Sequence, residues 1–502
     1  MNWKKLQNGS DIRGVALDGI EGETINLSPE VASILAKAFV AWLKQNTEDE
    51  SLSIAVGTDS RLSGPLLKEA FIKGLVASGA QVYDCGIAST PAMFMTTVSE
   101  NHATSAGVMI TASHLPFNRN GFKFFTRQGG LNKKDITDIL HLAETQNFKA
   151  STSPQSPKQW HFIDDYSQFL VDYIRKEAHI KAHYNTPLKG LKIIVDAGNG
   201  AGGFFASKVL EPLGADTSGS QFLEPDGHFP NHVPNPEDPE AMRAICEAVV
   251  KEKADLGVIF DTDVDRSAIV DAQGHPINRN ALIALISAVI LKEHPGSTIV
   301  TDSITSEGLS SFIEQDLKGK HHRFKRGYKN VINEAIRLNE SGTESHLAIE
   351  TSGHAALKEN YFLDDGAYLV AKLLVEAAKL NAQGKEITEL IGKLKEAKES
   401  REFRFTIKDE NFGDYGQKVL KEVEAKVRQM EAWEIVSPNY EGIRVRCTGS
   451  DEQGWFLLRM SLHDPVMPLN IESNISGGVN AIKAKLAELL QPYTQLTTEI
   501  LS

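Results

Sequence analysis

Short apolar runs alternate along the chain with stretches of helical spacing. The clearest apolar runs are Leu52–Val56, Leu191–Val195 and Thr298–Val300, and each of them ends in a polar turn. The helical stretches that follow them cover residues 65–77, 203–213 and 307–315. Strands that alternate with helices in this way indicate α/β domains with parallel or mixed sheets. Three units of one pattern predict an internal triplication.

The pattern changes near residue 400. We expect a Lys/Glu-rich helix to end at Glu399–Glu402, and a strand-rich region containing the apolar run Trp455–Ser461 to follow. This last quarter is therefore predicted to be a smaller α+β domain. A Pro/Ser segment at 151–157 and a long apolar helix at 281–291 mark two earlier boundaries. Together these changes predict four domains, at residues 1–157, 158–276, 277–400 and 401–502.

Composition narrows the class of protein. The chain has 502 residues, 41% of them hydrophobic, and a net charge of −13. An acidic chain without a block of basic residues is not expected to bind nucleic acid or an anionic membrane, although a local cationic pocket for a small anion remains compatible with it. The three cysteines are far apart, which suits a reducing compartment. No apolar stretch reaches about 18 residues and no signal peptide precedes the first strand, so we expect a cytoplasmic protein.

One segment carries a candidate nucleophile. Ser113 and His114 follow the apolar run 107–110, which predicts that they lie on the loop at the end of a strand. Lys123 comes ten residues after Ser113, behind what reads as an Asn-Gly turn. A hydroxyl on a rigid edge, an imidazole beside it and a nearby cation are what a phosphorylated serine needs. A polar turn without catalytic function is the alternative.

A second segment predicts a metal site. Asp261, Asp263 and Asp265 directly follow the buried run 256–260, and Arg266 comes next. In extended backbone the three carboxylates would project to one side, and a divalent cation would offset their repulsion. Oxygen ligands favour Mg²⁺. An EF-hand is excluded because it requires Gly and Glu where this chain has Arg266 and Ala272. A solvated acidic loop and a phosphatase of the haloacid-dehalogenase type, with Asp261 as nucleophile, remain alternatives.

These two segments together resemble the α-D-phosphohexomutase superfamily, the phosphoglucomutases and phosphomannomutases. Its phosphoserine loop reads Thr-Ala-Ser-His-Asn-Pro, which this chain matches except at Leu115, and its magnesium loop reads Asp-x-Asp-x-Asp-Arg. The resemblance implies four domains around a central cleft, three sharing a repeated α/β unit with mixed sheets, plus a smaller C-terminal α+β lid. It also implies that Ser113 and the three aspartates bind one Mg²⁺.

Further motifs extend the resemblance towards both ends of the chain. The segment 349–355 is similar to the family's sugar-binding loop, and Asp11–Gly14 to its first motif, so that Arg13 would contact the phosphate at the active site. Arg61 matches a family arginine, which we expect to form a structural ion pair. The substrate-binding residues that the resemblance implies are Arg266, Lys325, Glu350, Ser352, His354, Arg459, Ser461 and His463.

The chain departs from the family pattern in its last two domains. In the phosphate-binding loop of the fourth domain, Leu462, His463 and Asp464 replace the usual residues, and Pro468 stands where a second arginine is usual. The third domain lacks the lysine that bifunctional members carry near its first strand. The general acid and base are therefore not assigned, and His114, Lys123 and Lys325 are the candidates.

The resemblance implies a phosphohexomutase that interconverts hexose 1-phosphate and hexose 6-phosphate, with glucose or mannose as the sugar. The catalytic residues would be Ser113, His114, Arg13 and Lys123. A hexose 1,6-bisphosphate would be intermediate and activator, and the protein would be a monomer or homodimer. Two alternatives remain, an aspartyl phosphatase acting through Asp261 and a non-catalytic binder of sugar phosphates.

Overall fold

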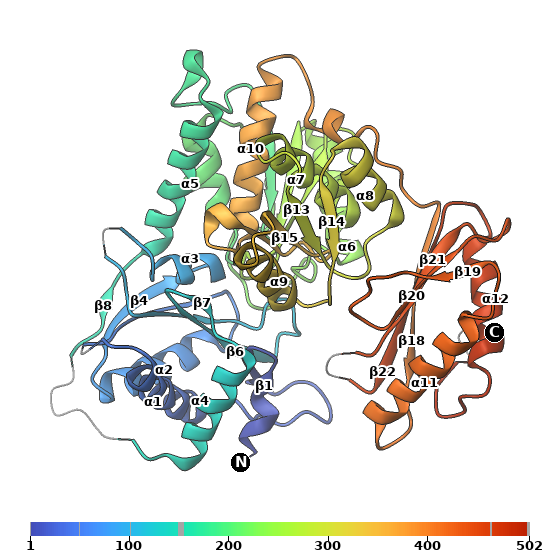
Figure 1. Cartoon of the computed structure of the whole chain (residues 1–502). Helices are drawn as coiled ribbons and strands as arrows, with labels where there is room; N and C mark the ends of the chain where they lie inside the picture. Colours follow the sequence, from blue (N-terminus) through green and yellow to red (C-terminus); the bar gives the residue numbers. More distant parts are fainter. Residues whose placement is uncertain (1, 50, 101, 149–154, 462–463, 499–502) are drawn as a thin grey trace. The chain divides into compact units, whose positions relative to one another are not determined.

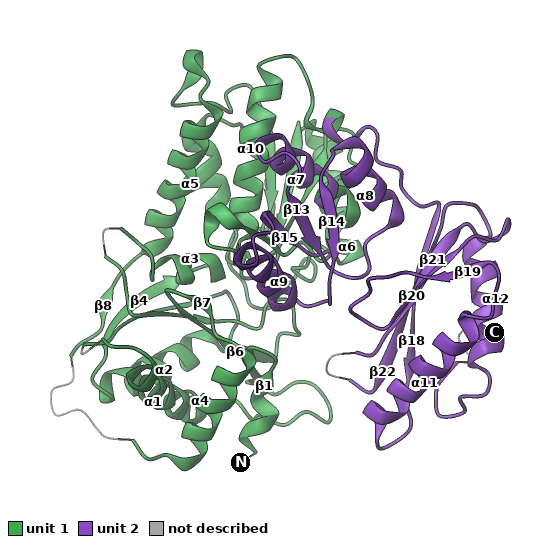
Figure 2. Ribbon diagram, viewed as in Figure 1, with its two compact units in different colours: residues 1–282, 352–389 green, residues 283–351, 390–502 purple. Residues whose placement is uncertain are grey.

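A computed structural model describes residues 2–49, 51–100, 102–148, 155–461 and 464–498 (Figure 1). The chain forms two compact units (Figure 2). Unit 1 comprises residues 1–282 and 352–389, and unit 2 comprises residues 283–351 and 390–502. Part of the predicted linker, residues 151–154, lies outside the described residues, and the predicted domain limits stay predictions.

The first sheet of unit 1 is mixed. Its central strands β3, β4 and β5 are parallel, whereas β6 lies between β5 and β2 and runs antiparallel to both. Helices α1, α2 and α4 contribute to its hydrophobic core, in which the rings of Phe39 and Phe124 lie 4.5 Å apart. The elements of this part are η1 (Trp3–Leu6), β1 (Gln7–Asn8), β2 (Asp11–Val15), α1 (Pro29–Asn46), β3 (Ser53–Thr58), α2 (Gly64–Ala77), β4 (Gln81–Ile87), α3 (Thr90–Met95), β5 (Ala106–Ile110), β6 (Arg119–Thr126), β7 (Gly129–Gly130), α4 (Lys133–Thr145) and β8 (Lys158–Gln159).

The second sheet of unit 1 has the order β12-β11-β10-β9. β9 and β10 are parallel and β11 returns antiparallel, so the acidic loop between β10 and β11 is a hairpin connection. The elements here are α5 (Phe162–Ala178), η2 (Lys181–His183), β9 (Ile193–Asp196), η3 (Phe205–Leu210), η4 (Glu211–Leu213), α6 (Pro239–Glu252), β10 (Leu256–Phe260), β11 (Ser267–Asp271), β12 (Pro276–Ile277), β16 (Ala355–Leu357), η6 (Lys358–Asn360), β17 (Leu363–Asp364) and α10 (Gly366–Asn381).

Unit 2 contains three parallel strands in the order β14-β13-β15 and a terminal antiparallel sheet in the order β18-β22-β21-β20-β19. Helices α11 and α12 share a hydrophobic core with the terminal sheet. The elements, with α7 and η7 crossing the unit limits, are α7 (Arg279–Glu293), β13 (Thr298–Thr301), α8 (Glu307–Ser311), η5 (Phe312–Asp316), β14 (Lys320–Arg323), α9 (Tyr328–Glu340), β15 (Ser345–Ile349), η7 (Ile387–Ile391), β18 (Glu399–Thr406), α11 (Phe412–Val427), β19 (Trp433–Ile435), β20 (Ile443–Cys447), β21 (Gly454–Leu458), β22 (Val466–Ser473) and α12 (Gly478–Leu490).

The predicted fold class is confirmed, since three α/β parts with mixed sheets precede a smaller sheet domain with two helices. Within the part of the chain that the structure describes, no helix is long and apolar enough to cross a membrane. The helix predicted over 203–213 is a π-helix followed by a 3-10 turn at Pro212, which has no N–H to continue helical bonding. The helix predicted over 307–315 likewise gives way to a π-helix at Phe312.

Two other predictions of local structure are wrong. The Lys/Glu segment before Glu399 is not a helix, because α10 ends at Asn381 and Gly384 follows in the left-handed region at φ 72°. Only the short η7 intervenes before β18. Asn120 and Gly121 do not form a turn either but lie within β6, where pairing with β2 holds them extended.

A buried carboxylate begins α10. Asp365 Oδ1 accepts hydrogen bonds from Tyr368 N at 2.8 Å and from the Tyr166 hydroxyl at 2.6 Å, and Asn360 donates to Oδ2 at 3.0 Å. Asp365 thus caps α10 and joins it to α5. Burial raises the pKa of Asp365 to about 6, with the hydrogen bonds acting in the opposite direction.

This pKa predicts a pH-dependent stability. A group whose folded pKa lies above its unfolded value stabilises the fold fully below the unfolded pKa, and that contribution is lost as the pH rises through the folded pKa. From pH 4 to pH 7 the wild type should therefore lose about 2 kcal/mol relative to Asp365→Asn, which does not titrate. Urea unfolding of both proteins across this range measures the difference, and parallel pH profiles would contradict the assignment.

Candidate active site

Ser113 is held on a strained turn at the end of β5. Its φ is 51°, a conformation rare outside glycine, and its backbone N donates to Thr111 Oγ1 at 2.8 Å. The Thr111 hydroxyl donates in turn to Asp59 Oδ2 at 2.6 Å. Ser113 is buried, so the sequence-predicted nucleophile has a fixed position rather than a place on a flexible loop.

Arg61 contacts the backbone of the loop that carries Ser113. Its guanidinium donates to the carbonyls of Pro116 at 2.8 Å and Leu115 at 2.5 Å, and also contacts the carbonyl of Ser113. The expected ion pair exists, with Arg61 Nε 3.5 Å from Asp59 Oδ2. Since Arg61 is buried, its principal role is to satisfy carbonyls that the turn would otherwise leave unpaired.

The acidic loop brings its carboxylates together by a turn. The extended backbone expected from the spacing is wrong, because Val264 lies in the left-handed region at φ 67° and its N donates to Asp261 O at 3.3 Å. Each of Asp261, Asp263 and Asp265 offers one carboxylate oxygen, and these atoms lie within 4.8 Å of one another. We call these three residues the aspartate trio.

The Ser113 loop and the aspartate trio meet within unit 1. The Ser113 hydroxyl donates to Asp261 Oδ2 at 2.9 Å, across 148 positions of sequence. Arg266 Nη2 donates to Ser113 Oγ at 3.1 Å, and its Nε donates to Asp261 Oδ2 at 3.2 Å. The nucleophile predicted from one segment and the acids predicted from another therefore share one buried position.

Two cations partly balance the aspartate trio. Lys123 Nζ lies 3.2 Å from Asp263 Oδ2 and also contacts Asp265, while Arg266 faces Asp261. Burial, followed by the charges of the other two aspartates, raises the pKa of Asp261 well above its usual value. Burial would also raise the pKa of Asp265, but Lys123 and its other cationic neighbours outweigh it and lower that pKa. Three acids against two bases leave one negative charge to compensate.

The aspartate trio fits a divalent cation. Asp263 Oδ1 and Asp265 Oδ1 are buried and accept no hydrogen bond from any described residue. Buried carboxylate oxygens without partners are costly, and a cation would satisfy both of them. A set made only of oxygen ligands is what Mg²⁺ prefers. Ser113 Oγ lies 2.9 Å from Asp261 Oδ2, and its part in the ligand set stays what the resemblance implies.

His114 and His354 are both neutral imidazoles at this site. Burial and then the charge of Arg266 lower the pKa of His114 to about 2. Arg266 donates to His114 Nδ1 at 2.6 Å, so the His114 proton resides on Nε2. Burial lowers the pKa of His354 to about 3, against the charge of Asp265. His354 Nδ1 is 2.9 Å from Ser352 Oγ, and its Nε2 is 3.6 Å from Asp265 Oδ1.

Arg13 is also part of this group in unit 1. It lies on β2, opposite Gly121 of β6. A Cβ atom added at Gly121 would lie 2.9 Å from Cδ of Arg13. The Arg13 guanidinium donates to Asp11 Oδ2 at 3.0 Å. Its charge contributes to the lowered pKa of both His114 and His354, after burial and the nearer charges.

The remaining predicted residues belong to unit 2. Glu350 accepts a hydrogen bond from Gly327 N at 2.7 Å, and Arg459 Nη1 lies 3.7 Å from Glu441 Oε1. Lys325 is exposed and lies over the ring of Phe324. The Ser461 hydroxyl accepts from Asp464 N at 3.4 Å, and His463 lies outside the described residues.

Some residues of the site have no signal in the sequence. Thr90 donates through its backbone N to Asp263 O at 2.8 Å, and Asn235 accepts from Arg266 Nη1 at 3.2 Å. In unit 2, Glu441 accepts from Arg326 N at 3.2 Å and links it to Arg459. Thr90 begins α3 and the others lie in loops without a recognisable motif, so only their tertiary neighbours show that they support charged groups.

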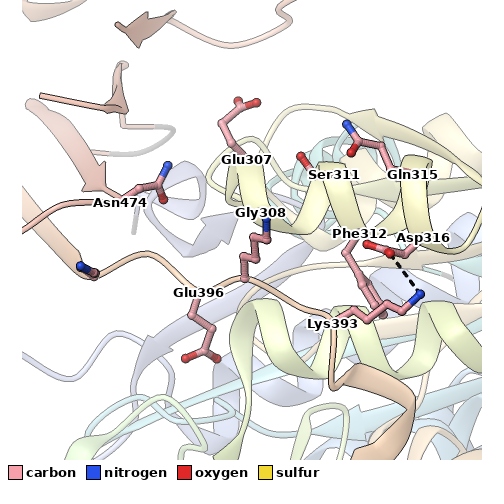
Figure 3. Close-up of a pocket in the computed structure, with 11 residues that line it drawn as sticks. Glu307, Gly308, Ser311, Phe312, Gln315, Asp316, Lys393, Glu396 and Asn474 are labelled. Atoms are coloured by element: carbon pink, nitrogen blue, oxygen red, sulfur yellow. Dashed lines mark ion pairs between the residues drawn. The ribbon is translucent and has the colours of Figure 1, made fainter. Parts of the chain in front are cut away.

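A cavity of about 560 Å³ in unit 2 lies apart from these residues (Figure 3). It is lined by α8, η5 and the segment before β18, and Lys393 there lies 3.6 Å from Asp316. None of the sequence-predicted site residues lines this cavity. Its size alone therefore does not make it the catalytic site.

Comparison with known proteins agrees with the geometry. Models described as phosphoglucomutase/phosphomannomutase, alpha/beta/alpha domains I, II and III match residues 4–150, 168–274 and 278–397. A phosphoglucomutase of Neisseria gonorrhoeae is 29% identical over 487 residues, covering 97% of this chain and 96% of the relative. A phosphomannomutase/phosphoglucomutase of Pseudomonas putida is 30% identical over 475 residues, 94% of each protein.

A solved structure shows the same fold over almost the whole chain. The crystal structure of a phosphoglucomutase/phosphomannomutase family protein from Burkholderia thailandensis superposes with a TM-score of 0.78 at 26% identity and covers 97% of both chains. A putative phosphomannomutase from Thermus thermophilus, 19% identical with a TM-score of 0.71, supports the fold alone.

The unbalanced charge of the aspartate trio predicts how Mg²⁺ affects the protein. Mg²⁺ should bind the wild type and raise its Tm. Asp263→Asn should lower the affinity for Mg²⁺ at least about tenfold. In the absence of Mg²⁺ this variant should differ little from the wild type in stability, because it leaves two acids for two cations. Calorimetric titration and thermal melts measure both effects. Asp138→Asn, at an exposed position of α4, is the control. Equal Mg²⁺ affinity in wild type and Asp263→Asn would refute the site.

Proposed function

We infer the reaction from the premise that this chain belongs to the phosphoglucomutase/phosphomannomutase family, as the three domain matches and the relatives show. It is accordingly a phosphohexomutase, an isomerase that acts on hexose phosphates. We propose in particular that Ser113 carries the transferred phosphoryl group and that the sugar passes through a 1,6-bisphosphate. The single observation that supports this most is the hydrogen bond from Ser113 Oγ to Asp261.

The proposed cycle has two matching halves. In the first, the O–P bond of phosphorylated Ser113 breaks, an O–P bond to a sugar hydroxyl forms, and the proton of that hydroxyl ends on Ser113 Oγ. The bisphosphate then turns over, and the second half returns its other phosphoryl group to Ser113 by the same steps in reverse. A free hexose 1,6-bisphosphate would prime unphosphorylated Ser113, which explains its role as activator.

Residues of unit 1 stabilise the charge that moves in this transfer. Arg266 already donates to Ser113 Oγ, so it can donate to the phosphoryl oxygens and to the departing serine oxygen. The neutral His114 presents its Nε2–H as a donor, since Arg266 occupies its Nδ1. Mg²⁺ held by the aspartate trio would supply further positive charge at the transferred group. Lys123 is tied to two aspartates, which suits it better to charge compensation than to proton transfer.

Residues of the segment 350–354 and of the terminal domain are proposed to bind the rest of the substrate. Glu350 offers a carboxylate oxygen to sugar hydroxyls, together with Ser352 and His354 from the same loop. Arg459 offers a guanidinium to the phosphate that does not react, with Ser461 and His463 beside it in sequence. Lys325 is exposed, and its ammonium is a candidate partner for a phosphate of the substrate. Glucose and mannose both suit this set of groups.

The location, the oligomeric state, the partners and the domain limits of the protein are also proposals. We propose that the protein acts in the cytoplasm as a monomer or homodimer on a small phosphosugar, without nucleic acid or membrane. The limits of its four domains, at 157, 276 and 400, are likewise proposed from sequence.

Removal of the nucleophile should abolish turnover. With glucose 1-phosphate, Mg²⁺ and catalytic glucose 1,6-bisphosphate in a coupled assay, Ser113→Ala should lose at least about 10³-fold in kcat, because no group remains to carry the phosphoryl group. Ser99→Ala, outside the site, should keep wild-type rates. Full activity of Ser113→Ala would exclude the proposal, and absence of turnover in the wild type would favour the non-catalytic binder.

The position of the covalent phosphate separates the mutase from the phosphatase. Mass spectrometry of the protein treated with glucose 1,6-bisphosphate should find an acid-stable phosphate on Ser113. An acid-labile adduct on Asp261 would instead support the aspartyl phosphatase.

The terminal domain should contribute to substrate affinity. Arg459→Lys keeps the charge but loses the forked donor geometry, so it should raise the KM for glucose 1-phosphate about tenfold with a smaller change in kcat. Arg404→Lys, exposed on β18 of the same sheet, is the matched control. Steady-state kinetics of the three proteins test this, and a KM unchanged in Arg459→Lys would remove Arg459 from the substrate site.

A further inference from the structure

A second group of metal-ligand side chains exists away from the aspartate trio. Among the described residues, His294, Glu344 and His346 each offer one ligand atom, and these atoms lie within 4.8 Å of one another. All three belong to unit 2. Two imidazoles and one carboxylate differ in kind from a set of acids, because imidazole nitrogen is a ligand for transition ions and not for Mg²⁺.

Local backbone bonds hold these three residues together. His294 follows α7, and its N donates to Ile290 O at 2.8 Å as the last helical bond. Four residues later, Thr298 N donates to Glu344 O at 2.8 Å. Glu344 directly precedes β15 and His346 is its second residue, so in extended backbone their side chains point to the same side. The end of α7 and the start of β15 are therefore held next to each other where the three side chains meet.

The side chains are already in contact. The rings of His294 and His346 are stacked with centroids 3.5 Å apart and planes inclined by 4°. His346 Nε2 lies 2.6 Å from Glu344 Oε1. A metal lies in the plane of each imidazole it binds, so the rings must open from this parallel stack when a cation enters. The Glu344 side chain is 60% exposed, which allows that adjustment and gives an ion direct access from water.

We propose that His294, Glu344 and His346 form a binding site for a divalent transition ion, with Zn²⁺ as the best match. Two imidazoles and a carboxylate are a common zinc ligand set, and water completes the coordination. The carbonyl end of α7 adds a negative partial charge that favours a cation at His294. His346 stands four residues before Glu350 on β15, about 13 Å along an extended strand. The site would thus join α7 to β15 without contacting the sugar-binding loop.

Zinc binding by the full-length protein tests the proposal. Isothermal titration with Zn²⁺ is done in a large excess of Mg²⁺, so that the aspartate trio is occupied. The wild type should bind Zn²⁺ at one additional site and gain in Tm. His294→Gln and His346→Gln should each weaken this binding at least about tenfold and lose the gain in Tm, because two ligands hold zinc far less well than three. His141→Gln, at an exposed position of α4, should behave as wild type.

A further variant protects the test against misfolding. Glu344 is exposed, so Glu344→Gln removes the carboxylate with little effect on packing and should also weaken Zn²⁺ binding. Mg²⁺ binding by the aspartate trio reports that each variant is folded. No Zn²⁺ binding by the wild type in excess Mg²⁺ would overturn the proposal, and so would Zn²⁺ affinity in Glu344→Gln equal to that of the wild type.

Discussion

The structure of the site depends on one electrostatic constraint, the burial of three carboxylates around a serine hydroxyl. Lys123 and Arg266 compensate two of the charges, and a third remains. Burial of an uncompensated charge is costly, so the pKa of Asp261 rises while two carboxylate oxygens stay without hydrogen bonds. A divalent cation resolves this imbalance.

The backbone of the two loops positions the serine and the carboxylates. Ser113 follows β5 and Asp261 follows β10, so both stand beyond the carboxyl ends of strands that have parallel neighbours, where ligands commonly bind in α/β folds. Left-handed turns at Ser113 and Val264 aim the side chains, and Arg61 satisfies the carbonyls that the first turn exposes. The geometry of the candidate site is thus built from strand ends and two residues in the left-handed region.

The strand β15 carries different chemistry at its two ends. Glu350, for which we propose a role in sugar binding, follows its carboxyl end, whereas the histidine and glutamate pair lies at its amino end. Oxygen ligands in the aspartate trio and imidazole ligands near α7 select different cations for physical reasons, namely ligand hardness and preferred geometry. The two groups of ligands therefore differ in the cations that they prefer.

The sequence by itself determined the α/β class, the hydroxyl of Ser113 and the spacing of the aspartates, because these follow from local periodicity and short motifs. It could not show that the acidic loop turns at Val264, or that Gly384 stands where the predicted Lys/Glu-rich helix would continue. Nor could it show that Arg61 binds backbone carbonyls as well as pairing with Asp59. Thr90 and Asn235 had no local signal at all. Only tertiary structure decided these points, since each depends on atoms that are distant in the chain and meet through packing and the balance of buried charge.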